Sequence, residues 1–131
     1  MSQTDPTPVR RAPVLPVCVL VRDLILGSRI SAVAAGNGAP IVTVRDPGKL
    51  SGAAGARLIV DLNLEGAIPA AAAWRAAAPG REVVGFVSHV DADTAKAARA
   101  AGVDQVLARS RFVEVLPILL TGQIGNPWDG S

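Results

Sequence analysis

Five short runs of β-branched and other apolar residues recur along the chain, and their spacing constrains the fold more than any other feature. They span residues 17–21, 41–44, 57–61, 82–87 and 105–108. Most are apolar without alternation, which is typical of strands covered by helices on both faces. Longer Ala-rich segments separate the runs. The sequence therefore predicts an α/β fold, a doubly wound five-stranded parallel sheet in a three-layer α/β/α arrangement.

The segments between the runs carry signals for where helices begin and end. Residues 24–35 stop at GNG, which suits the end of a helix. A second helix is expected to open at Pro69 and to close before Pro79. The glycine-rich connection 46–55 is expected to hold only a short or irregular helix.

Two further helices are expected in the last third of the chain. DADTAKAARAAG has Asp91 at the N-cap position and Gly102 at the stop. The last helix is expected over residues 111–121, where Pro117 should kink or shorten it.

Length and composition fit one domain without a nucleic-acid partner. The chain has 131 residues, and we expect residues 14–121 to form the domain. Residues 1–13 and 122–131 have the composition of loose tails. Thirteen Lys and Arg against eleven Asp and Glu give a net charge of +2, which is too balanced to imply nucleic-acid binding. The single Cys18 excludes a disulfide framework and is expected to be buried.

A basic pair ahead of an apolar run imitates an export signal near the N-terminus. Arg10 and Arg11 precede VLPVCVLV. Arg22 and Asp23 then interrupt the apolar run at about half of the ~18 residues that a membrane span requires. No small-residue cleavage pattern follows directly, so we expect a cytoplasmic protein that does not associate with membranes.

Polar and charged side chains follow every predicted strand. Ligands of parallel sheets bind beyond the carboxyl ends of the strands, so these residues are the candidates for a functional site. The set comprises Arg22, Asp23, Arg45, Asp46, Asp61, Asn63, Ser88, His89, Arg109, Ser110 and Arg111. Solvation explains charged strand ends, but it does not predict two acids, a hydroxyl group and a cation at one edge.

Three motifs share their order and spacing with a known family. Asp61 ends the third run and Asn63 follows it, VSHV supplies Ser88, and AARAAGVDQVLARSRF joins a helix, an Ala-Gly turn, a strand and a basic end. Over residues 14–121 the chain resembles a response-regulator receiver domain. The resemblance implies the flavodoxin-like or CheY-like strand order 2-1-3-4-5.

The same resemblance implies a phosphoryl-transfer site. In the family an acid pair follows the first strand, a phosphoacceptor Asp follows the third, Ser or Thr ends the fourth and Lys ends the fifth. By this match Asp61 is the phosphoacceptor, Ser88 bonds the phosphoryl group and Arg109 pairs with it. Mg²⁺ would be held by the carboxylates of Asp23 and Asp61 and by the main-chain carbonyl of Asn63.

The chain departs from the family pattern at three positions. Arg22 stands where the family has the first acid, so we expect Mg²⁺ binding to be weakened by repulsion and by a lost ligand. Arg109 or Ser110 takes the place of the family lysine, depending on the alignment. The fifth run also lacks the aromatic residue through which the family often relays activation.

Two functions are consistent with this pattern. One is a stand-alone receiver-like signalling domain in a two-component phosphorelay, phosphorylated on Asp61 by a histidine kinase or a phosphotransfer protein. The alternative is a pseudo-receiver that acts as a phosphorylation-independent protein-interaction module. We expect no enzyme in either case, since His89 is the single histidine and has no partner acid at motif spacing.

A protein-binding face is expected on the side of the domain that runs from Asp91 to Thr121. The family commonly uses this face for output, and here it carries Lys96, Arg99 and Arg111. No DNA-binding segment is recognisable in the sequence, so we expect output through protein contact.

Overall fold

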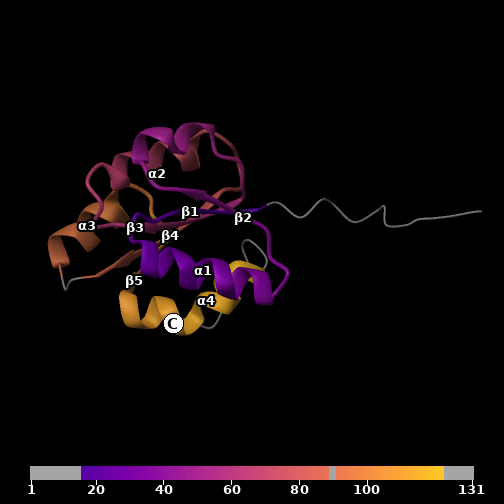
Figure 1. Ribbon diagram of the computed structural model, residues 1–131. Coiled ribbons are helices and arrows are strands. Elements are labelled where there is room, and N and C mark those ends of the chain that lie inside the picture. Colours follow the sequence, from indigo (N-terminus) through magenta and orange to yellow (C-terminus); the bar gives the residue numbers. More distant parts are fainter. Residues whose placement is uncertain (1–15, 89–90, 123–131) are drawn as a thin grey trace, which may run out of the picture.

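The computed structural model describes residues 16–88 and 91–122, in which strands and helices alternate (Figure 1). In chain order the elements are β1 Val17–Leu20, α1 Leu24–Gly36, β2 Ile41–Val44, the 3₁₀ helix η3 Pro47–Gly52, β3 Arg57–Asp61, α2 Ala67–Ala76, β4 Glu82–Val87, α3 Ala92–Ala100, β5 Gln105–Ala108 and α4 Arg109–Thr121. The five predicted strands are confirmed, although β1 ends one residue early. Three predictions concern residues outside the described ranges: the tail 1–13, the tail 122–131 except for Gly122, and His89.

The strands form one parallel sheet in the order β2-β1-β3-β4-β5, which confirms the predicted strand order. Leu20 pairs with Val60, Val60 with Gly85, and Val87 with Ala108. Because every pair is parallel and in this register, the carboxyl ends of the strands meet at one edge of the sheet.

Helices cover both faces of the sheet and complete three layers (Figure 1). On one face α1 and α4 lie side by side, and on the other lie η3, α2 and α3. Successive strand residues alternate between these layers. Val19 and Ile59 belong to the core under α1 and α4, whereas Leu20 and Val60 belong to the core that contains Trp74 of α2. Burial on both faces explains why the runs lack polar alternation.

The connection between β2 and β3 holds a short helix, as predicted, whereas the helix after β3 begins earlier than predicted. Residues 46–55 hold the short η3, which the Asp46 carboxylate caps through the Gly48 amide at 2.9 Å. α2 begins at Ala67, two residues before Pro69. Gly66 adopts a φ of 81° at the N-cap, and Pro69 then lies in the first turn, where a missing N–H costs little.

The last helix is longer than the sequence predicts. α4 begins at Arg109, directly after β5, and continues through Pro117 to Thr121. The Thr121 hydroxyl donates to the Pro117 carbonyl at 2.7 Å. Pro117 does not shorten α4, since the helix continues on both sides of it. The apolar side of α4 packs onto the sheet, and this packing offsets the backbone hydrogen bond that a proline removes.

Cys18 lies fully buried within β1, as expected. Burial raises the pKa of its thiol to about 11, so the group is protonated at neutral pH and unreactive.

The helices formed by residues 16–88 and 91–122 are all too short or too polar to cross a membrane.

Candidate functional site

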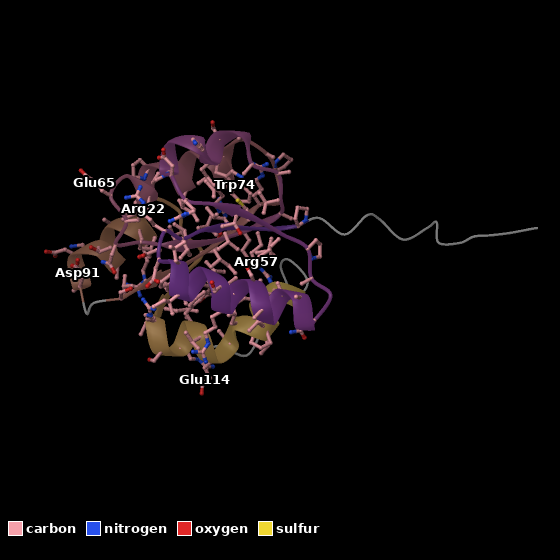
Figure 2. All side chains as sticks on the ribbon, viewed as in Figure 1. Arg22, Arg57, Glu65, Trp74, Asp91 and Glu114 are labelled. Atoms are coloured by element: carbon pink, nitrogen blue, oxygen red, sulfur yellow. The ribbon has the colours of Figure 1, made fainter. Side chains whose placement is uncertain are left out.

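The sheet register brings the predicted site residues to one edge. Asp61 is the last residue of β3 and pairs with Phe86 of β4, so Ser88 lies just beyond the end of the neighbouring strand. Asp23 follows β1, which pairs with β3 on its other side. Arg109 follows β5, where Ala108 pairs with Val87. Figure 2 shows Arg22, Glu65 and Asp91 at this same end of the molecule.

Asp23 is positioned by the helix that it begins. It is the N-cap of α1, and its Oδ1 accepts from the amides of Ile25 at 2.9 Å and Leu26 at 3.2 Å. The pKa of Asp23 lies below its ordinary value, chiefly because the Leu26 amide bonds the ionised form. The Ile25 amide and the Arg109 guanidinium lower this pKa further.

Asp61 leaves the sheet through a tight local turn. Its Oδ1 accepts from the Asn63 amide at 3.0 Å, an arrangement in which an aspartate side chain mimics a backbone turn. Between them Leu62 is buried, and its amide donates to the Phe86 carbonyl at 2.9 Å. Gly85 gives the Leu62 side chain its space, since a Cβ at Gly85 would lie 2.6 Å from Leu62 carbons. The turn thus holds Asp61 half-buried at the edge.

Asn63 connects two of the loops at the edge. Its side-chain Oδ1 accepts from the Ser88 amide at 2.6 Å. The sequence predicts a role for Asn63 only through its main-chain carbonyl, and the side-chain bond is an addition that the structure makes. No local signal indicates it, because the bond depends on the pairing of β3 with β4.

Arg109 reaches across the edge from β5. Its Nη1 lies 3.5 Å from Ser88 Oγ, and its Nη2 lies 3.5 Å from Asp23 Oδ2. The side chains of Arg109 and Asp23 are 40% and 41% exposed, so the ion pair is open to solvent. Ser110, the other residue aligned with the family lysine, is exposed on the first turn of α4. The cation that the described structure brings to Ser88 and Asp23 is therefore Arg109.

Arg22 makes its hydrogen bonds on the other side of β1. Its Nε donates to the Arg45 carbonyl at 3.3 Å, and Arg45 Nη2 donates back to the Arg22 carbonyl at 3.4 Å. Arg45 follows β2, which is separated from β3 and β4 by β1. These bonds draw Arg22 toward the β2 end of the edge, whereas Asn63, Ser88 and Arg109 meet at the β4 and β5 end.

The side chains at this edge do not fit a divalent cation as they are arranged. Asp23 has Oδ1 bonded to two amides and Oδ2 paired with Arg109, and Asp61 has Oδ1 bonded to the Asn63 amide. Within residues 16–88 and 91–122, no group of three or more His, Cys, Asp or Glu side chains is placed to hold a metal ion. A guanidinium beside a hydroxyl suits an oxyanion instead.

An exposed apolar pair adjoins the site and was missed in the sequence. Leu24 and Ile25 occupy the first turn of α1 with exposed fractions of 65% and 83%. They follow Asp23 directly, so they lie beside the Asp23–Arg109 pair. Their exposure follows from the helix rotation that buries Leu26 and Ile30 instead.

The predicted partner face carries less free positive charge than the sequence suggested. Lys96 and Arg99 are exposed on α3. Arg111 of α4 forms an ion pair with Glu114 one turn later, so its charge is partly neutralised.

Comparison with solved structures identifies the class of fold. The phosphorylated cyanobacterial phytochrome response regulator RcpA matches with a TM-score of 0.70 at 13% identity, over 87% of this chain and 100% of its own. A response regulator from Burkholderia pseudomallei, solved with a phosphorylated aspartic acid, a calcium ion and citrate, matches at 0.68 and 16% identity, over 82% of this chain and 67% of its own. A response regulator from Hahella chejuensis matches with a TM-score of 0.67 at 22% identity, over 82% of this chain and 96% of its own.

These likenesses show that the chain has the CheY-like fold of response-regulator receiver domains, as the sequence predicted. No protein-family model matches the sequence, and no curated protein matches it.

Proposed function

We propose that this protein is a receiver-like signalling module that accepts a phosphoryl group on Asp61. The observation that supports the proposal is the strand register, which puts the ends of β3, β4 and β5 at one edge of the sheet, with Arg109 Nη1 3.5 Å from Ser88 Oγ. A carboxylate can accept a phosphoryl group, and a hydroxyl group and a guanidinium can bond its oxygens and offset their charge.

The chemistry is a transfer between two nucleophiles. A carboxylate oxygen of Asp61 attacks the phosphorus of a phosphohistidine, an O–P bond forms, the P–N bond breaks and the electron pair returns to the imidazole nitrogen. Arg109 neutralises the charge on the phosphoryl oxygens, and the Ser88 hydroxyl donates to one of them.

The partner that fits this chemistry is a histidine kinase or a phosphotransfer protein in the cytoplasm. The exposed Leu24 and Ile25 offer apolar contact area beside Asp23. A second partner for output would use the face that carries Lys96 and Arg99. The protein itself would transmit a signal and catalyse no reaction on another substrate.

Labelling with phosphoramidate tests the proposal. We expect intact-mass spectrometry to show one phosphoryl group on the native protein and none on Asp61→Asn. Asp93→Asn is the matched control, because Asp93 is an exposed acid on α3, and it should be labelled like the native protein. Equal labelling of Asp61→Asn would contradict the proposal.

The pseudo-receiver is the second candidate, and the lack of an aromatic residue in β5 favours it. In that case the protein would bind its partner whether or not Asp61 is modified. Binding measured by calorimetry should then survive Asp61→Asn but weaken on Arg99→Glu. Loss of binding in a folded Asp61→Asn variant would exclude this candidate and identify Asp61 as a switch.

A further inference from the structure

Asp23 has no carboxylate oxygen left without a partner in this arrangement. Two backbone amides at the start of α1 bond Oδ1, and the Arg109 guanidinium pairs with Oδ2. The same guanidinium reaches Ser88 Oγ, and the Ser88 amide donates to Asn63 Oδ1. A chain of contacts therefore runs from the end of β1 to the end of β3, with Arg109 at its centre.

We propose that Arg109 is the resident counter-cation of this site, so that the edge binds a phosphate-type oxyanion without a divalent metal, and Mg²⁺ competes with Arg109 for Asp23. The proposal deepens the function proposed above and rests on the same site. It concerns which cation offsets the negative charge at this edge, and it does not concern whether Asp61 is modified.

Electrostatics favours this arrangement over a bound metal. A divalent cation on Asp23 Oδ2 would lie close to the guanidinium that is 3.5 Å from that oxygen, and like charges at such distances repel. The metal would also have to share Asp23 with the two amides that fix the first turn of α1. Displacing Arg109 is therefore part of the free-energy cost of binding Mg²⁺.

The geometry of Arg109 also suits an anion. Its two terminal nitrogens face different partners, Nη1 toward Ser88 and Nη2 toward Asp23. Both contacts are 3.5 Å long and open to solvent, so Arg109 is held loosely and can turn to an arriving oxyanion. A guanidinium can then bond two oxygens of one phosphoryl group, which a lysine ammonium does less specifically.

Titration with MgCl₂, followed through the amide NMR signals of Asp23, Asp61 and Asn63, tests the competition. The native protein should bind Mg²⁺ weakly, and Arg109→Gln should bind it about tenfold more tightly because the competing charge is gone. Arg109→Lys should stay close to native. Arg75→Gln, which removes the same charge from the surface of α2, where Arg75 pairs with Asp104, is the matched control and should not change the affinity. Equal affinity in the native protein and Arg109→Gln would overturn the proposal.

Phosphoramidate labelling with Mg²⁺ and with EDTA separates this proposal from the function on which it rests. We expect the native protein to label at similar rates in both, and Arg109→Gln to label about tenfold more slowly in EDTA and to recover with Mg²⁺. Native labelling that requires Mg²⁺ would overturn the resident-cation proposal and leave the function intact. Absence of labelling in every condition would refute the function, while the Mg²⁺ titration would still decide the role of Arg109.

Discussion

At the scale of single residues, Asp23 joins local structure to the site. Its carboxylate caps α1 through the Ile25 and Leu26 amides and pairs with Arg109 across the edge. The pKa of this carboxyl group is depressed mainly by the amide bonds, so most of the effect is local. A residue that would be read from sequence as a metal ligand is thus also a helix cap.

We expect Asp23→Ala to lower the free energy of unfolding at pH 7. Because the folded-state pKa is depressed, the contribution of the ionised group is present above the unfolded pKa of about 4 and is lost as pH falls through the folded pKa. Urea denaturation from neutral to acidic pH should therefore show the native and variant curves converging. Asp93→Ala is the control and should change stability less. A gap that stays constant with pH would mean that the ionised carboxylate is not the cause.

At the scale of elements, β4 shapes the turn that carries Asp61. Gly85 lies in the middle of β4 and pairs with Val60, and the buried Leu62 side chain fills the space above it. The glycine is needed for packing rather than for backbone conformation. The chain after β3 can therefore bury Leu62 against β4, and the next residue, Asn63, accepts the hydrogen bond from the Ser88 amide.

Gly85→Ala should destabilise the fold, because the new Cβ would meet three Leu62 carbons at 2.6 to 2.7 Å. Overpacking of this kind costs about 1–3 kcal/mol in the free energy of unfolding, measurable by urea denaturation. Gly27→Ala is the matched control in α1, where nothing lies within 4 Å of the added Cβ. That change should stabilise the helix by up to about 1 kcal/mol. A neutral Gly85→Ala would show that Leu62 can move without cost.

At the scale of the whole molecule, Arg57 ties the sheet to the end of the chain that the structure describes. It lies in the interior in Figure 2 and is 2% exposed. Its Nε pairs with Glu82 at 2.6 Å, and its Nη1 donates to the carbonyls of Leu119 at 2.6 Å and Gly122 at 3.1 Å. A single buried cation therefore satisfies carbonyl groups at the end of α4 and joins them to β3 and β4.

Arg57→Met should cost about 3–5 kcal/mol in the free energy of unfolding, because it leaves Glu82 and two carbonyls without their donor. Hydrogen exchange should also show earlier opening of the last turn of α4. Arg75→Met provides the comparison, since Arg75 pairs with Asp104 at the surface, where solvent screens the pair, and it should cost much less than Arg57→Met. Similar losses for the two variants would contradict the role assigned to Arg57.

Much of the fold could be predicted because burial determines which residue types occupy each strand and helix. Runs such as RLIVD have no polar alternation since both faces of the sheet are covered, and the Ala-rich segments fit the layers above and below. The grouping of Asp23, Asp61, Ser88 and Arg109 at one edge followed from that parallel sheet. The starts of α2 and α4 were harder to place, because Gly66 and Ala108 are weak start signals without a capping side chain.

The sequence by itself determined the layers, the strand order implied by its resemblance, and the edge on which the polar residues gather, since these depend on hydrophobic pattern and chain direction. Only the tertiary structure decided which polar atoms pair. Arg22 could have faced Asp61 but bonds the Arg45 carbonyl, and Arg109 rather than Ser110 reaches Asp23. Long flexible side chains at a crowded edge have several compatible partners, and the register and twist of neighbouring strands select among them.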